Sequence, residues 1–428
     1  MSVSPARMAA FDILLRIESE RAFSSILLPS YEETLSQLDR GLCHELVLGT
    51  LRRQIKLDRI IDVLAQGKTI DTEIRIALRL GLYQLQYLEK IPDHSAINES
   101  VELVKRAKKR SATGFVNAIL RRATRETVDL VYTDDIDRIC IETSHPRWLI
   151  EKWTADRGLD EAERIAIGNN EPPQIAFRVI GEGDDRTQQL ISNAQASDAV
   201  EGCFTLDRNS RELLDLASEG RIYIQDEASQ MTALAVSVPV NGAFLDVCAA
   251  PGGKTGLIAS RNSPHLTVAG DLYQPRVEML RENCDRQGVE ASILRYDAEK
   301  PLPFAEGVFD AVLVDAPCTG TGTIRHHPEI RYFLRPEDVV DLSSKQRRIL
   351  TNASKTVKQG GSLVYSTCSL EPEEGEAICE WFLQEHSAFR QTRPNVPERF
   401  LIDGHFGRTW SHRDGMDGFF IAAFERMA

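Results

Sequence analysis

Two cysteines follow two short apolar runs, and thiols placed in this way could act together on one substrate. Residues Phe309–Asp315 lead into Cys318 through a Pro-Cys turn, and the run that begins at Ser362 leads into Cys368 through a Thr-Cys-Ser turn. A thiolate is the nucleophilic form of cysteine, so such a pair is a candidate for covalent chemistry. Two isolated buried cysteines are the alternative, because cysteine is common in protein cores. The matching turns favour a functional pair.

The elements around these cysteines should bring them together. Both apolar runs are typical of strands that are buried on both faces of a parallel sheet. The residues between them, 336–358, are polar and have apolar positions at helical spacing. A strand, a helix and a parallel strand form a right-handed crossover that can place the two strands side by side. We therefore expect both thiols at the carboxyl edge of the sheet, where open α/β sheets bind ligands.

A loop of small residues follows an earlier predicted strand, Ala243–Cys248, and is a candidate for binding a cofactor. Small side chains let backbone N–H groups approach a ligand, and the N-terminus of the following helix favours a carboxylate or phosphate. The Gly-Lys-Thr sequence at 253–255 lacks the earlier glycine of a P-loop, and the dinucleotide G-x-G-x-x-G pattern is absent, so neither an NTPase nor a dehydrogenase is indicated. The loop residues are Cys248, Ala249, Ala250, Pro251, Gly252, Gly253 and Lys254.

Three aspartates end successive predicted strands and could surround a nucleoside. Asp271 follows Asp246 by about 25 residues, close to the spacing at which a carboxylate meets ribose hydroxyls. Asp297 is placed to accept a hydrogen bond from an adenine amino group or a water, and Asp315 ends the strand before Cys318. Each aspartate alone could be a simple turn cap. Together with the small-residue loop, they predict a pocket for S-adenosylmethionine.

The order of the predicted elements divides the chain into three domains. Residues 1–133 have the 3.6-residue apolar period of helices throughout. Residues 134–220 indicate a small α+β module that feeds substrate to the domain after it. Residues 221–428 alternate strand and helix and end in an antiparallel strand, the pattern of a doubly wound, Rossmann-like α/β domain. The fold class is therefore multidomain, with all-α, small α+β and α/β parts.

The N-terminal domain carries a strongly basic stretch. A helix is expected at 96–106, capped by Asp93 or Ser95, and within residues 101–125 eight lysines and arginines stand against the single acid Glu102. The whole chain has a net charge of −13. A run of charges is often only a solvated helix face, but on an acidic background this one could bind RNA phosphates. The candidate contacts are Lys105, Lys108, Lys109, Arg121 and Arg122.

The composition limits the classes of protein to which this chain can belong. Charged residues make up 27% and hydrophobic residues 42% of the chain, as in ordinary globular proteins. The eight cysteines are scattered and form no C-x-x-C pair, so we expect no metal site and a reducing, cytoplasmic environment. No signal peptide and no apolar run of about 18 residues is present, which predicts no membrane association. We expect the protein to act as a monomer.

The stretches Asp246–Thr255, Asp315–Gly322 and Ser366–Glu374 are similar to the catalytic motifs of the RNA 5-methylcytosine methyltransferases of the Sun/RsmB type. Gln225–Ser229 matches the start of the catalytic domain in that family, and the helical run Leu42–Arg125 resembles a NusB-like RNA-binding domain. The likeness covers nearly the whole chain, and the catalytic motifs are highly specific in combination. It implies an S-adenosylmethionine-dependent enzyme that methylates C5 of a cytosine in 16S ribosomal RNA of the small subunit.

The resemblance also assigns roles to the two thiols. Cytosine C5 is a poor nucleophile, and addition of a thiolate to C6 makes C5 reactive toward the methyl group; a base must then remove the C5 proton. In this family the Thr-Cys cysteine attacks, which corresponds to Cys368, and Cys318 assists product release. A Pro-Cys turn supplies the nucleophile of DNA cytosine methyltransferases, which would favour Cys318 instead. Asp315 would act catalytically by binding the N3/N4 edge of the cytosine.

Two positions depart from the family pattern. Gly375 stands where relatives carry asparagine after Pro-Glu-Glu, and His326 stands where an arginine is usual. Beside the latter, Arg325, His327 and Arg331 are expected to form a basic flank next to the catalytic loop, suited to RNA phosphate. The competing hypothesis is a binding module, in which a methyltransferase-like scaffold with a NusB-like arm only holds RNA or protein. The intact thiols and the intact small-residue loop favour the enzyme.

Overall fold

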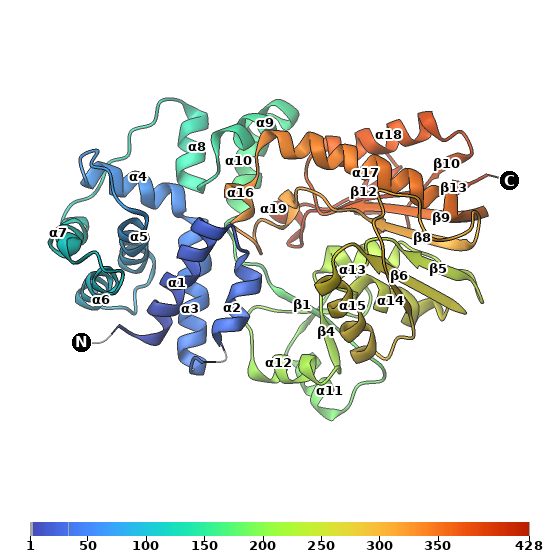
Figure 1. The fold of residues 1–428 in the computed structure, drawn as a ribbon, viewed down its shortest axis with the longest axis horizontal. Coiled ribbons are helices and arrows are strands. Elements are labelled where there is room, and N and C mark those ends of the chain that lie inside the picture. The colour runs from blue at the N-terminus through green and yellow to red at the C-terminus, as the bar shows by residue number, and fades with distance from the viewer. Residues whose placement is uncertain (1–2, 33, 428) are drawn as a thin grey trace. The chain divides into compact units, whose positions relative to one another are not determined.

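The chain folds into two compact units in the computed structural model, which describes residues 3–32 and 34–427. The first unit extends to Glu171 and includes the short segment His326–Leu334. The second unit comprises Pro172–Arg325 and the residues from Arg335 onward (Figure 1). Within the described ranges, no helix has both the length and the apolar character that crossing a bilayer requires.

The first unit is helical, as the sequence predicts for the N-terminal domain. Apolar residues at helical spacing, among them Ile13, Leu46 and Leu80, are fully buried in one core shared by the helices α1 to α7. The helices are α1 (Pro5–Glu20), α2 (Ser24–Glu32), α3 (Gln37–Arg52), α4 (Gln54–Leu64), α5 (Thr72–Tyr87), α6 (Asp93–Arg106), α7 (Thr113–Ala123), α8 (Asp135–Thr143), α9 (Arg147–Arg157), α10 (Leu159–Gly168) and α16 (Ile330–Phe333).

Helix α6 begins earlier than predicted. It starts at Asp93, with Pro92 in the N-cap position and no side-chain cap, so the expected capping by Asp93 or Ser95 is wrong. Proline suits this position because its missing N–H is one that the first turn leaves unpaired anyway. Asp93 instead lies in the first turn, where its charge meets the positive end of the helix dipole.

The division between the two units falls at a different place from the predicted domain boundaries. Helices α8, α9 and α10 pack on one another within the first unit, which therefore extends to Glu171. The boundaries at residues 133 and 220 stay predictions of where independently folding domains end.

The second unit contains a small antiparallel sheet with the strand order β2-β3-β1-β4. Its strands are β1 (Ile175–Val179), β2 (Gln195–Ala196), β3 (Cys203–Leu206) and β4 (Ile222–Ile224). Helices α11 (Asp185–Ser192) and α12 (Arg211–Ser218) bury Leu190, Leu213 and Leu216 with Phe177 and Ile222 of this sheet.

The second unit also contains the predicted doubly wound sheet. Its strand order is β11-β12-β13-β9-β8-β5-β6-β7, with β10 beside β13. The pairs from β9 to β7 are parallel, and β13 is antiparallel to β9, as predicted for the last strand. The strands are β5 (Ala243–Asp246), β6 (Leu266–Asp271), β7 (Ser292–Arg295), β8 (Phe309–Asp315), β9 (Val357–Thr367), β10 (Phe389–Thr392), β11 (Leu401–Ile402), β12 (Phe406–Arg408) and β13 (Phe420–Arg426).

Strands β8 and β9 lie side by side at the centre of this sheet (Figure 1). The crossover between them includes α17 (Pro336–Thr356), which packs on both strands. Asp315 at the end of β8 is opposite Ser366 near the end of β9. The two cysteine turns therefore leave the sheet at the same edge. The remaining helices of the second unit are α13 (Glu227–Leu234), α14 (Gly253–Asn262), α15 (Gln274–Arg286), α18 (Glu376–Glu385) and α19 (Ser411–Asp414).

Candidate active site

The two thiols that the sequence singled out lie next to each other. Cys318 Sγ and Cys368 Sγ are 3.4 Å apart, close enough to share one proton in a hydrogen bond. Both side chains are half-buried, and both line the same cavity. The parallel pairing of β8 with β9 explains this closeness, because it aligns the carboxyl ends of the two strands.

The environment of Cys318 keeps a proton on its sulfur. Its pKa is raised well above the ordinary value, first by its hydrogen bond to Cys368 and then by burial and by the charge of Cys368. The negative charge of Glu374 adds to the same effect.

Asp315 is held in place by two donors. Lys254 Nζ donates to Oδ2 and Ser366 Oγ donates to Oδ1, each at 2.7 Å. Burial opposes the charge of Lys254, but the charge of Asp315 and its hydrogen bond outweigh burial and raise the pKa of Lys254. A carboxylate offers about four lone-pair positions, so Asp315 can still accept from a substrate.

A cavity of about 350 Å³ lies at the carboxyl edge of the sheet and has a size suited to a small ligand. Five of the predicted cofactor residues line it: Cys248, Ala250, Asp271, Asp297 and Asp315. Five others do not: Ala249, Pro251, Gly252, Gly253 and Lys254. The cofactor role of all ten residues stays a prediction, and the cavity brings together the two ends of that set: the start of the loop and the three aspartates.

The inner residues of that loop shape its backbone. Gly252 has a φ of +103°, which an L side chain rarely adopts. A Cβ on Gly253 would lie 2.7 Å from the ring of Tyr223. Arg178 Nη2 donates to the Gly253 carbonyl at 3.3 Å, and Gln287 Nε2 donates to the Gly252 carbonyl at the same distance. These glycines are needed for the turn and for its close packing.

A second buried carboxylate lies under the loop. Asp246 ends β5 and is 1% exposed, and Thr255 Oγ1 donates to its Oδ2 at 2.7 Å. Burial raises the pKa of Asp246 to about 7. Asp246 does not line the cavity, and its hydrogen bond with Thr255 joins the end of β5 to α14.

Sequence reasoning missed several residues that line the cavity. Arg276 Nη2 donates to the Ala250 carbonyl at 2.9 Å, and its Nε lies 3.1 Å from Asp271 Oδ2. Tyr273 and Tyr296 lie close to strand-ending aspartates, so their aromatic character next to those acids was a usable signal. Other lining residues gave no such signal because they come from the middle of α17: Lys345 and Ile349.

The expected basic flank is wrong for both of its arginines. Arg325 is 5% exposed, and it pairs with Asp417 at 2.7 Å and with Asp226 at 3.0 Å. Arg331 is fully buried in the first unit, where its Nη1 donates to the Thr143 carbonyl at 3.1 Å. Burial lowers the pKa of Arg331 to about 10. Both guanidinium groups therefore have internal partners in place of the exposed position that was expected of them.

The basic stretch of the first unit is only partly available to phosphate. Lys105 pairs with Glu102, Lys109 with Asp71 at 2.8 Å, and Arg122 with Glu126 at 2.6 Å. Lys108 and Arg121 are exposed, and Arg121 donates to the amide oxygen of Asn117 at 3.1 Å. The cations therefore differ in how much of their charge nearby carboxylates already neutralise.

Two family models match the chain. The model described as 16S rRNA methyltransferase RsmB/F matches residues 233–425, and the NusB family model matches residues 4–125. The first covers the doubly wound sheet with both cysteine turns, and the second covers the helical core of the first unit.

Known proteins match over the full length of the chain. It is 35% identical to the "Probable ribosomal RNA small subunit methyltransferase B" of Bacillus subtilis, over 100% of both chains. It is 33% identical to the "Ribosomal RNA small subunit methyltransferase B" of Pseudomonas putida, over 99% of this chain and 98% of the relative. The crystal structure titled "PH0851" is similar with a TM-score of 0.83 and 25% identity, over 100% of both chains.

The cavity fits the cofactor of a methyltransferase. Asp271 and Asp297 supply carboxylates for hydroxyl and amino groups, Tyr273 and Tyr296 supply aromatic faces, and the small side chains of Cys248 and its neighbours leave room for a nucleoside. The methyltransferase match confirms that S-adenosylmethionine is the cofactor. This chain belongs to the family of the ribosomal RNA small subunit methyltransferases B, with a NusB-family domain before its catalytic domain.

Proposed function

We propose that this protein methylates C5 of a cytosine in 16S ribosomal RNA and that Cys368 is its nucleophile. The observation that carries the proposal is the pair of sulfur atoms, 3.4 Å apart, in the wall of the cofactor cavity. A cytosine placed against that wall can meet a thiol and the methyl donor together. The names of the full-length relatives support ribosomal RNA as the substrate.

The thiol pair suits the chemistry that C5 methylation requires. Cys368 attacks C6 as a thiolate and forms a C–S bond, and the electron pair of the C5–C6 double bond becomes available at C5. When bound, S-adenosylmethionine would supply the methyl group that C5 takes, and its sulfonium would leave as the neutral thioether S-adenosylhomocysteine. A base removes the C5 proton, the C5–C6 double bond re-forms, and Cys368 leaves again as a thiolate. Asp315 holds the N3/N4 edge of the base during these steps.

The raised pKa of Cys318 supports this division of roles. Its hydrogen bond to Cys368, burial and the charge of Cys368 all favour the protonated form of Cys318, which is then not the attacking thiolate. In the adduct the sulfur of Cys368 is a neutral thioether, which removes its charge and its hydrogen bond from the surroundings of Cys318. Both of these raise the pKa of Cys318 in the free enzyme, so that pKa falls once the adduct forms. Cys318 can then release its proton to solvent and, as a thiolate, accept the proton from C5.

The proposed substrate can be tested directly in cells. Deleting the gene should remove one 5-methylcytosine from 16S ribosomal RNA, mapped at single-nucleotide resolution by bisulfite sequencing, and the wild-type gene should restore it. Identical maps in the deleted and parental cells would contradict the proposal. We also infer a cytoplasmic site of action, which is where this RNA lies and which suits eight free cysteines.

The basic stretch of the first unit should contribute to RNA binding through its less neutralised cations. Replacing Lys108 and Arg121 by alanine should flatten the log–log salt dependence of RNA binding by about 1.4 for single strands or about 1.8 for a duplex. Replacing Lys109 and Arg122, which are paired with carboxylates, is the matched control and should change the slope less. Fluorescence anisotropy at several salt concentrations measures both. An unchanged slope for Lys108 and Arg121 would make the stretch a solvated helix face.

A further inference from the structure

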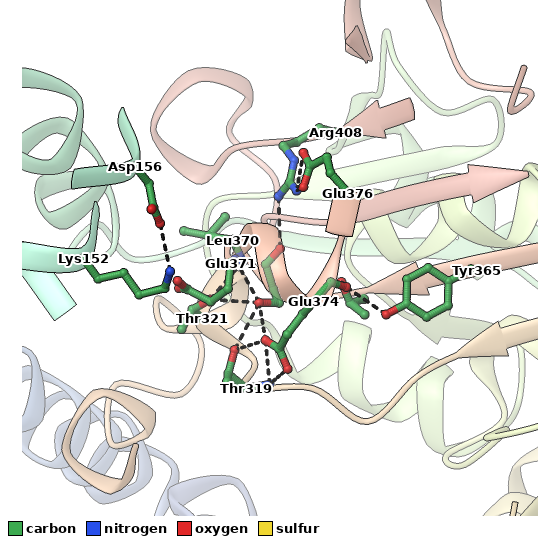
Figure 2. A network of polar contacts seen from close by, with 12 residues as sticks. Lys152, Asp156, Thr319, Thr321, Tyr365, Leu370, Glu371, Glu374, Glu376 and Arg408 are labelled. Carbon is green, nitrogen blue, oxygen red and sulfur yellow. Dashed lines mark hydrogen bonds and ion pairs between the residues drawn. The ribbon is translucent and has the colours of Figure 1, made fainter. Parts of the chain in front are cut away.

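Glu374 lies between the two turns that carry the cysteines. Its side chain is 0% exposed, and it follows β9 in the short helical turn Pro372–Glu374. Figure 2 shows its carboxylate directed at Thr319, the residue after Cys318. Its side chain does not line the cofactor cavity, and the proposed chemistry gives it no contact with the substrate.

The carboxylate of Glu374 accepts hydrogen bonds from both turns. The Thr319 N–H donates to Oε1 at 3.0 Å, and the Thr319 hydroxyl donates to Oε2. The hydroxyl of Ser369, the residue after Cys368, donates to the same Oε2. One oxygen atom therefore joins the two residues that directly follow the two cysteines.

The surroundings of Glu374 hold it rigidly. Gln346 Nε2 of α17 donates to Oε1 at 2.9 Å, and the Tyr365 hydroxyl of β9 donates to the Glu374 main-chain carbonyl at 2.8 Å. Burial raises the pKa of Glu374, against the hydrogen bonds of Ser369, Thr319 and Gln346. Side chains locked in this way by surrounding packing and hydrogen bonds can hold a site to within about 0.5 Å.

We propose that Glu374 is a positioning residue whose carboxylate sets the separation of Cys318 and Cys368 by bridging Thr319 and Ser369. The inference rests on the proposed function, in which both thiols act on one cytosine. If the two thiols move apart, the protein can still bind its cofactor. The thiols can then no longer attack C6 and remove the C5 proton of the same cytosine. Displacements of about 1 Å can cost about 100-fold in rate.

Two substitutions separate the reach of the side chain from its charge. Glu374→Asp keeps the charge but withdraws the carboxylate by one methylene, roughly 1.5 Å, so it cannot bridge both turns. Glu374→Gln keeps the reach and one acceptor oxygen, which can stay on the Thr319 N–H and on Gln346. Its amide nitrogen would then face the hydroxyls of Thr319 and Ser369, and a hydroxyl can turn to accept. If the carboxylate acts as a bridge, the hydrogen bonds to Thr319 and Ser369 should be weakened more in Glu374→Asp than in Glu374→Gln.

The separation of the thiols can be measured by oxidising them. Diamide takes two electrons and two protons from Cys318 and Cys368, which form a disulfide while diamide is reduced to a hydrazine. Mass spectrometry of the linked peptides gives the rate for this pair alone. We expect Glu374→Asp to slow disulfide formation about tenfold and Glu374→Gln to slow it less than about threefold. Glu380→Asp, the same change at an exposed position of α18, should leave the rate unchanged.

The charge of Glu374 gives a second readout that a merely structural residue would not move. Its charge raises the pKa of Cys318, so Glu374→Gln should shift the alkylation of Cys318 by iodoacetamide to lower pH, while Glu374→Asp leaves it closer to wild type. Affinity for S-adenosylmethionine, measured by calorimetry, shows that each variant is folded, because Glu374 does not line the cavity. A folded Glu374→Asp that forms the disulfide at the wild-type rate would overturn the proposal.

A second pair of variants keeps the test decisive if Glu374→Asp does not fold. Thr319→Val and Ser369→Ala remove the two hydroxyl donors and leave the carboxylate in place, and together they should slow disulfide formation about tenfold. An unchanged rate would likewise overturn the bridge. None of these measurements needs RNA. Wild-type protein that fails to methylate cytosine would refute the proposed function while leaving the bridge between the turns standing.

Discussion

Replacing Cys368 by alanine should reduce methyl transfer to RNA by at least about 1,000-fold, because the base can no longer be activated through C6. Affinity for S-adenosylmethionine should stay within a few-fold of wild type. Cys368 is only one of many residues in the cavity wall, and the carboxylates at the strand ends remain. Transfer of a radiolabelled methyl group to RNA measures the activity, and calorimetry measures the affinity for S-adenosylmethionine.

Cys379→Ala is the matched control for this experiment. Cys379 is fully buried on α18 of the same unit and does not line the cavity, so its loss tests the effect of removing a thiol from the fold alone. Its activity should remain within about twofold of wild type, apart from a modest loss of stability. Substantial activity in Cys368→Ala would move the nucleophile to Cys318.

Removing Cys318 should produce a covalent protein–RNA complex that accumulates. Cys368 can still attack C6 and the methyl group can still be taken up, but the C5 proton is then removed slowly and Cys368 is not expelled. Cys318→Ala incubated with substrate RNA and S-adenosylmethionine should therefore give a band of higher mass that survives a denaturing gel. Cys368→Ala and the double variant should give none.

The yield of the covalent complex should depend on whether the target cytosine is single-stranded or paired. The target base must leave its stack to reach both thiols, so a single-stranded loop should react better than a duplex. An adduct that appears with Cys368→Ala but not with Cys318→Ala would reverse the roles of the two cysteines.

The sequence predicted those features that follow from strand order. Strand β8 and the second half of β9 are short apolar runs, and the crossover rule predicted that they place Cys318 beside Cys368. Asp271 at the end of β6 and Asp297, two residues after the end of β7, line the cavity for the same reason. Parallel strands end at one edge, so residues at their carboxyl ends converge whatever lies between them.

Other features could not be predicted because they depend on burial and on long-range partners. The charges of Arg325 and Arg331 suggested an RNA surface, yet both guanidinium groups are buried among internal acceptors. The sequence did not indicate that Glu374 lies buried between the two cysteine turns, because its partners Thr319 and Gln346 precede it by 55 and 28 residues. Patterns along the chain report which face of an element is apolar, but they do not report which buried polar groups meet.

The segment His326–Leu334 has a consequence for how this protein can evolve. It leaves the second unit directly after Arg325 and folds as part of the first, where the fully buried Arg331 donates to the Thr143 and Asn169 carbonyls. The chain therefore passes between the units at three points, after Glu171, Arg325 and Leu334. A recombination event with a single junction that exchanged the helical domain would leave Arg331 in place and remove the carbonyls that accept from it, so the incoming domain would have to supply equivalent acceptors. We therefore expect these nine residues and the helical domain to change together.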